Sequence, residues 1–199
     1  MIDKQSMLIY IIIVFVIFMG LKIYSESDAF NLKCIISDVD GERYCVRERS
    51  KMELAANLLA TVTQNLKDLV AYCAKKFPED ENVQRMVQKF NPTKISETLP
   101  TSEYTAYSEN KGEKLAFCLD KRKNGTTLID INTLTFVAIH ELAHIMTKTE
   151  GHKQEFWENF KFLLEQAKAA NIYQPVDYKK NNKSYCGMDI TDNPYYDLK

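Results

Sequence analysis

An uninterrupted apolar run begins near the N-terminus. Residues 7–21 read MLIYIIIVFVIFMGL and contain no charged side chain. If Lys22 extends its ammonium group to the lipid headgroups and the next two residues lie at the interface, the run reaches about 18 residues, which is enough to span a bilayer. The pattern predicts a single membrane-spanning helix over 7–24 behind a short tail, 1–6. A cleaved signal peptide is the weaker alternative, because the run stays bulky to its end and offers no small-x-small cleavage site.

Beyond a polar linker, 25–31, the apolar positions recur with the periods of regular secondary structure. In the segment 50–77 they lie three and four residues apart, which predicts a long amphipathic core helix. Ser50 and Glu53 have the spacing of a capping box at its start, and Pro78 ends it. The same spacing predicts further helices over 81–90, 132–146 and 153–170.

Short runs of β-forming residues lie between the helical segments. A hairpin with the loop 38–41 precedes the long helix. A small antiparallel sheet is predicted over 104–107, 114–119 and 127–131, which are separated by turn-forming Asn and Gly residues. The segment 173–199 is expected to be irregular and to pack through its aromatic residues. We therefore expect an α+β fold in which 32–199 form one domain.

Composition narrows the classes of function. The chain has 26 Lys and Arg residues against 27 Asp and Glu residues, so no global basic field exists to hold a nucleic acid, and no nucleic-acid partner is expected. Its five cysteines form no CxxC pair, and an odd number leaves at least one unpaired. Cys34 and Cys45 flank the predicted hairpin loop and would face each other across the strands. A disulfide between them is expected only in an oxidising compartment.

The candidate chemistry is concentrated in residues 140–144, which read HELAH. On a helix, His140 and His144 lie on one face and can aim two imidazoles at one metal ion. Glu141 lies about 100° around the helix from His140, beside the metal face, where it suits a general base that takes a proton from water. The alternative without chemistry is an amphipathic helix whose two histidines simply face solvent.

A catalytic zinc ion needs a third protein ligand and keeps its fourth position for water. His152 is the remaining histidine of the chain and follows Gly151, which can reverse the backbone toward the first two ligands. Glu150, at the tenth position after His140, and Glu165, on the polar side of the last predicted helix, are the alternatives.

These residues resemble a known family. The HELAH motif, followed by Gly151, His152 and the aromatic pair 156–157, resembles the WLM and SprT-like zinc metallopeptidases. Further segments resemble the membrane-anchored metallopeptidase-like proteins of large eukaryotic DNA viruses: 44–47 (YCVR), 105–108 (TAYS), 110–112 (NKG), 136–139 (FVAI) and 185–187 (YCG). The resemblance implies a zincin-like domain with the active-site helix against a small sheet, and zinc held by His140, His144 and His152.

The leading hypothesis is a membrane-anchored zinc endopeptidase in which Glu141 is the general base. An edge strand, over 105–108 or 114–119, would align a peptide substrate by β-addition, and Tyr107, Tyr178 or Tyr185 could assist the oxyanion. The expected partners are a peptide or protein substrate, a bilayer through residues 7–24, and viral capsid or membrane proteins. The expected location is a virion inner membrane or a host endomembrane. The alternative is a catalytically silent membrane or virion structural protein whose zinc site only stabilises the fold.

Overall fold

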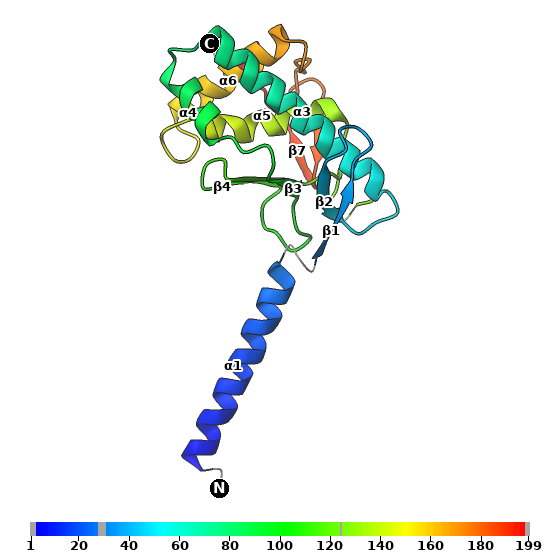
Figure 1. The fold of residues 1–199 in the computed structure, drawn as a ribbon, viewed down its shortest axis with the longest axis vertical. Helices are drawn as coiled ribbons and strands as arrows, with labels where there is room; N and C mark the ends of the chain where they lie inside the picture. The colour runs from blue at the N-terminus through cyan, green and yellow to red at the C-terminus, as the bar shows by residue number, and fades with distance from the viewer. Residues whose placement is uncertain (1–2, 28–30, 124, 198–199) are drawn as a thin grey trace.

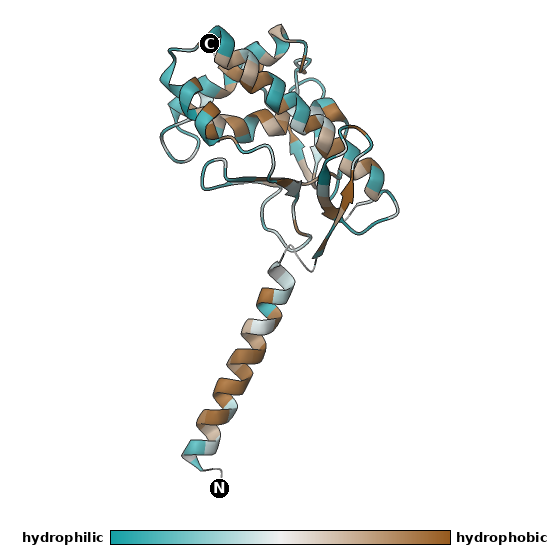
Figure 2. Ribbon diagram, in the orientation of Figure 1, coloured by the Kyte–Doolittle hydropathy of each residue, from teal (hydrophilic) through white to brown (hydrophobic). Residues whose placement is uncertain are grey.

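The apolar N-terminal run forms one long helix, α1, Lys4–Glu26. The computed structural model describes residues 3–27, 31–123 and 125–197, so residues 1–2, 28–30 and 198–199 of the expected tail, linker and domain lie outside it. α1 extends away from the remaining elements (Figure 1), and its middle is apolar while its two ends carry hydrophilic residues (Figure 2). Within it, Gln5–Ser25 is long and apolar enough to cross a membrane. An N-terminal signal sequence shares these properties.

A five-stranded sheet of mixed direction underlies the helices, in the order β1-β2-β3-β5-β4. Its strands are β1 (Leu32–Ile36), β2 (Arg43–Arg47), β3 (Ile95–Glu97), β4 (Ala106–Glu109) and β5 (Lys114–Phe117). The hairpins β1–β2 and β4–β5 are antiparallel, whereas β3 lies parallel to both β2 and β5. The expectation of a purely antiparallel sheet is therefore wrong. The reason is that the chain between β2 and β3 crosses over through helices and returns in the same direction.

Among the residues that the structure describes, five helices follow α1: α3 (Met52–Lys76), α4 (Glu81–Lys89), α5 (Ile131–Met146), α6 (Gln154–Ala169) and α7 (Pro194–Asp197). The predicted core helices are confirmed, with ends shifted by a residue or two. The predicted capping box is wrong, because α3 begins after Lys51 without a side-chain cap. The strand expected over 127–131 is also wrong, since only Leu128 forms a bridge, to Asp120.

The helices gather on one face of the sheet, with α5 in the middle of their layer (Figure 1). α5 contacts α3, α4 and α6, and it also approaches the edge strand β4. Twelve of its sixteen residues are buried, which makes it the most enclosed helix of the fold. This burial holds the predicted metal-binding helix rigidly against the sheet edge.

The C-terminal segment is more ordered than its composition indicates. The strands β6 (Lys183–Tyr185) and β7 (Met188–Ile190) form a second, two-stranded antiparallel sheet, where irregular structure was expected. The expectation of aromatic packing is confirmed, because Tyr173, Tyr178 and Tyr185 are each at most 2% exposed.

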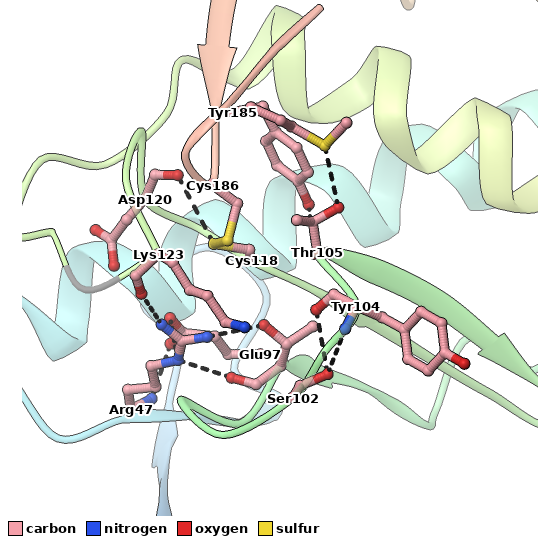
Figure 3. The surroundings of a disulfide bond; sticks show 12 residues. Arg47, Glu97, Ser102, Tyr104, Thr105, Cys118, Asp120, Lys123, Tyr185 and Cys186 are labelled. Atoms are coloured by element: carbon pink, nitrogen blue, oxygen red, sulfur yellow. Dashed lines mark hydrogen bonds and ion pairs between the residues drawn. A yellow bond between two sulfur atoms is a disulfide. The ribbon is translucent and has the colours of Figure 1, made fainter.

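Two disulfides cross-link the domain. Cys34 and Cys45 are direct partners across the β1–β2 hairpin and form the expected disulfide. Cys118, just after β5, is bonded to Cys186, between β6 and β7 (Figure 3). The second disulfide was not predicted, because its cysteines are 68 residues apart in the sequence and only the tertiary fold brings them together. Cys73 is the buried free cysteine.

A buried ion cluster lies where the parallel strands end. We use this name for Arg47 and Arg49 near the end of β2, Glu97 at the end of β3 and Asp120 after β5. Their side chains are at most 10% exposed. Arg49 pairs with Glu97 and, at 2.6 Å, with Asp120. Arg47 Nε lies 3.5 Å from Glu97 Oε1, and Figure 3 shows Arg47, Glu97 and Asp120. The two positive charges balance the two negative charges within the cluster.

Candidate metal site

The first two histidines are placed by the helix α5. Asp130 caps its N-terminus, with its carboxylate accepting hydrogen bonds from the Thr133 backbone N–H and hydroxyl at 2.9 and 2.8 Å. The helix then continues without interruption to Met146, so His140 and His144 lie one turn apart on the same face. Both side chains are partly buried. The predicted helical placement of the HELAH motif is confirmed.

The third histidine, His152, lies in the loop between α5 and α6. Gly151 has φ of +77°, a left-handed conformation that suits glycine, and the chain reverses there toward the helix. His152 Nε2 then lies 3.1 Å from His140 Nε2 and 3.1 Å from His144 Nε2. One ligand atom from each of the three side chains lies within 4.8 Å of the others. We call these three residues the histidine cluster.

Aromatic rings of α6 support the histidine cluster from below. The fully buried Phe156 ring lies 4.9, 4.3 and 4.6 Å, between centroids, from the rings of His140, His144 and His152. Trp157 Nε1 donates a hydrogen bond to the His152 carbonyl at 3.1 Å. These contacts restrict the three imidazoles to one arrangement and separate them from bulk water on that side.

The loop between α5 and His152 is held from two directions. From the β4–β5 turn, Lys111 Nζ donates to the backbone carbonyls of Thr147, Lys148 and Thr149 at 2.9 to 3.2 Å. From α6, the Glu155 carboxylate accepts hydrogen bonds from the Lys148 and Thr149 backbone N–H groups. Sequence reasoning missed both residues. Lys111 was visible only as part of a turn, and nothing in its spacing shows which loop it reaches.

Two members of the histidine cluster, His140 and His144, carry little positive charge near neutral pH. Burial, with the neighbouring His144 and His152, lowers the pKa of His140 to about 3. Burial, His152 and Lys111 lower the pKa of His144 to about 4. Neutral imidazoles are the form that binds metal ions, so these two ligands need not lose a proton at pH 7.

Glu141 is placed beside the cluster with an almost fully buried side chain. It is 6% exposed and lines the same cavity as the three histidines. Burial raises the pKa of Glu141 to about 8. A divalent cation held by the histidines would act in the opposite direction, because a nearby positive charge favours the carboxylate form.

The donor set fits a zinc ion. Zinc–nitrogen bonds of about 2.0 to 2.1 Å in tetrahedral geometry put two donor nitrogens roughly 3.3 Å apart. The observed distances of 3.1 Å from His152 to each of the other two imidazoles are close to that value. Three imidazole nitrogen donors lie together on one wall of the cavity, which leaves room for a further ligand, as a catalytic zinc site requires.

The two carboxylates considered as alternative ligands lie differently. Glu150 lines the cavity, but its side chain is 86% exposed and pairs with Lys111 at 3.1 Å. Glu165 is exposed on α6 and does not line the cavity. The group of side chains that could hold a metal ion, among the residues the structure describes, consists of the three histidines.

The cavity at the histidine cluster, which we call the histidine pocket, has a volume of about 330 Å³ and lies between α5 and β4. β4 is an edge strand, whereas β5 pairs with β3 on one side and β4 on the other. Of the two runs considered for peptide alignment, only the one that forms β4 has a free edge. Its residues Ala106, Tyr107 and Ser108 line the histidine pocket opposite the histidines.

The three candidate tyrosines have different surroundings. Tyr107 lines the histidine pocket. The Tyr185 hydroxyl donates a hydrogen bond to the Thr105 carbonyl at 3.0 Å, and the residue is buried. Tyr178 is buried against the ring of Phe136 and lines neither this pocket nor the adjoining one. Tyr107 is therefore the tyrosine best placed to approach a ligand at the histidine cluster.

The fold and site together define an α+β domain with a three-histidine cluster that could bind a metal ion, attached to one long apolar helix. No family model matches the chain. "Uncharacterized protein R325" of Acanthamoeba polyphaga mimivirus is 28% identical over 190 residues, which cover 94% of this chain and 93% of that protein. "Uncharacterized protein 136R" of Invertebrate iridescent virus 6 is 33% identical over 81 residues, covering 41% of this chain and 44% of the relative. The expected similarity to viral proteins is confirmed.

Among solved structures, Wss1 from Saccharomyces cerevisiae is similar with a TM-score of 0.46 and 16% sequence identity. The match covers 62% of this chain and 84% of Wss1. This likeness is too distant to assign a function, so the functional argument rests on the residues of the site.

Proposed function

We propose that this chain is a membrane-anchored, zinc-dependent endopeptidase. The observation that carries the proposal is the convergence of three imidazoles beside the buried carboxylate of Glu141, in a pocket bordered by an edge strand. The resemblance to WLM and SprT-like zinc metallopeptidases, noted from the HELAH motif, supports the same reading.

His140, His144 and His152 would hold the metal, and Phe156 would keep their rings in place. A zinc ion bound there supplies Lewis-acid chemistry, which lowers the pKa of water and polarises a carbonyl group. Glu141 lies beside the ligand face, where it takes a proton from the attacking water and delivers it to the leaving amine. A purely structural metal site would need no such base.

The edge strand β4 would position the substrate. An extended peptide can add to the sheet alongside this edge strand and pass in front of the histidine cluster. This arrangement selects an unfolded or extended segment, since a peptide already within a sheet or helix has no free backbone groups to offer.

The N-terminal apolar segment suggests where in the cell the protein acts. We propose that residues 7–24 span a bilayer, behind the tail 1–6, and that the linker 25–31 connects them to the metallopeptidase domain, 32–199. The two disulfides favour an oxidising compartment for that domain. With viral relatives, a virion inner membrane or a host endomembrane is the proposed site, and viral capsid or membrane proteins are the proposed partners there.

The test uses the full-length chain in detergent micelles. We expect one zinc ion per chain by elemental analysis and zinc-dependent cleavage of unfolded casein. Glu141→Gln should keep the zinc and lower turnover about 10²- to 10⁴-fold, because the proton acceptor is lost. Full turnover in Glu141→Gln would contradict the role of Glu141. Bound zinc without cleavage of any unfolded substrate would favour the alternative, a silent structural protein whose zinc only stabilises the fold.

A further inference from the structure

A second pocket adjoins the histidine cluster on the side of Glu141. It has a volume of about 330 Å³ and shares His140, Glu141 and Ala106 with the histidine pocket. We call it the hairpin pocket, because the β6–β7 hairpin forms one of its walls. Because Ala106 of β4 lines both pockets, a peptide aligned along β4 in front of the histidines would also pass beside the hairpin pocket.

The two pockets differ in chemistry. Apolar side chains form the body of the hairpin pocket: Phe136 and Val137 from α5, and Met188 and Ile190 from β7. Thr191 and Asp192 lie among its lining residues as polar groups. The histidine pocket beyond the cluster is lined by two tyrosines and by Lys111, Glu150 and Ser108, so it carries more charged groups and no aliphatic side chain larger than Ala106. Apolar walls of this kind favour an apolar ligand group, since burial of its surface is favourable and an unpaired charge there is costly.

The β6–β7 hairpin, which forms one wall of the hairpin pocket, is bonded to neighbouring segments by a disulfide and by hydrogen bonds. The Cys118–Cys186 disulfide joins it covalently to the end of β5 (Figure 3). The backbone N–H groups of Cys186 and Gly187 donate to the carbonyls of Asp120 and Lys121, both at 2.9 Å. The Tyr185 hydroxyl and the Met188 sulfur contact Thr105, which lies immediately before β4.

We propose that the hairpin pocket receives one bulky apolar side chain of the peptide next to the scissile bond, and that the disulfide-bonded β6–β7 hairpin determines this specificity. The proposal rests on the proposed peptidase function and names the substrate class of that site: extended peptides with Leu, Ile, Met or Phe at one position beside the cleaved bond. The volume of the hairpin pocket suits one such side chain rather than a folded surface.

Cleavage-site mapping on unfolded casein by mass spectrometry tests the preference directly. We expect one position beside the cleaved bond to be enriched in large apolar residues. In synthetic peptides, Leu→Ala at that position should lower kcat/KM at least about tenfold, because even one missing methylene in an apolar pocket costs about 10- to 200-fold. Cleavage with no enrichment at any flanking position would overturn the specificity proposal and leave the peptidase proposal standing.

A binding measurement separates the two proposals. The zinc-loaded Glu141→Gln protein is titrated with fluorescein-labelled, alanine-based nonapeptides that carry a central Leu or Asp, and anisotropy is recorded. We expect at least about tenfold tighter binding of the Leu peptide. If the wild-type protein cleaves nothing but this preference holds, the peptidase proposal fails and the pocket remains. Equal binding of the two peptides overturns the pocket.

Met188→Lys tests the hairpin wall itself. Met188 is 51% exposed, so the charge should not prevent folding. We expect the Leu-over-Asp preference to fall at least about tenfold, because a cation in the wall repels apolar groups and attracts a carboxylate. Leu54→Lys is the matched control, since Leu54 is 56% exposed on α3 and lines neither pocket. An unchanged preference in Met188→Lys would contradict the assignment of the wall.

Removal of each disulfide in turn provides a test of the hairpin and a matched control. Replacing Cys118 and Cys186 with serine frees the hairpin, and we expect a weaker Leu-over-Asp preference. Replacing Cys34 and Cys45 with serine removes the disulfide of the β1–β2 hairpin, at the opposite edge of the sheet, and should leave the preference unchanged. Equal effects of the two double substitutions would show that the Cys118–Cys186 disulfide acts only through global stability, and would overturn its proposed role.

Discussion

The protein contains two clusters of polar side chains, the ion cluster and the histidine cluster. They differ in whether their members have partners of opposite charge. In the ion cluster, each charge meets an opposite charge, and the Arg47 guanidinium also donates to the Thr98 and Lys123 carbonyls at 2.7 and 2.6 Å. In the histidine cluster, three like groups face one another, and His152 Nε2 lies 3.1 Å from the Nε2 atoms of both His140 and His144. The charges of the first cluster balance one another within the chain, whereas the second is suited to receive a cation.

The two clusters also differ in what encloses them. The ion cluster is closed by the ends of three parallel strands and the following loops. The histidine cluster has aromatic rings below it and an open pocket above. A buried charge without its partner costs far more than a buried neutral group. We therefore expect the ion cluster to stabilise the fold and the histidine cluster to bind a ligand, and each expectation can be tested by removing one member of the cluster.

The largest effect is expected from removing a metal ligand. His152→Ala leaves two imidazoles, so zinc affinity should fall by more than the roughly 10- to 100-fold that loss of an outer-shell partner causes. The exposed position of His152 on a loop implies little change in the thermal midpoint of the metal-free protein. Competition with a chromophoric chelator measures the affinity. Unchanged affinity would reassign the third ligand, with Glu150 and Glu165 as the remaining candidates.

Removing a member of the ion cluster should act on stability instead. Glu97→Gln leaves two arginines with one carboxylate, and we expect a loss of about 3 to 5 kcal/mol in the free energy of unfolding. Zinc affinity of the folded fraction should not change, because Glu97 does not line the histidine pocket. Urea unfolding of the metal-free protein measures the loss. Glu48→Gln, at an exposed ion pair with Lys33, is the control with little expected effect.

A smaller effect is expected from the lysine that holds the loop before His152. Lys111→Met removes the donor to three backbone carbonyls, so the loop should place His152 less well and zinc affinity should fall about 10-fold. The matched control is Lys94→Met, which removes an exposed lysine at an ion pair with Glu113. If both variants bind zinc equally well, Lys111 does not position the ligand.

The smallest expected effect is on pH dependence, and its sign differs between the clusters. The pKa values of His140 and His144 are lowered by folding, so they contribute stability that is complete above about pH 6.5 and is lost as pH falls toward 4. Burial raises the pKa values of Glu97 and Asp120, so those groups contribute stability at low pH that is lost as pH rises through their folded pKa.

Urea unfolding in EDTA at pH 7 and pH 5 tests the histidine contribution. The metal-free protein should lose stability between these values, and His144→Leu should lose less, because the buried imidazole that resists protonation has been removed. An identical loss in both proteins would show that another group accounts for the pH dependence.

Several features of the fold and of the histidine cluster were predictable from the local sequence pattern alone. The three- and four-residue spacing of apolar positions was enough to predict the helices, and the spacing of His140 and His144 was enough to place them on one face. The Cys34–Cys45 pair was predictable for the same reason, since a short hairpin brings its flanking residues opposite each other. In these cases the information lies within about a dozen neighbouring residues.

Long-range contacts were decided by the tertiary structure. Glu97 lies 48 residues from Arg49, and Cys186 lies 68 residues from Cys118. No periodicity connects such positions. They meet because the helical crossover makes β2, β3 and β5 parallel, so that the ends of all three strands gather at one edge. Local sequence therefore specified the histidine-bearing helix, while the path of the chain between elements decided which residues enclose the site.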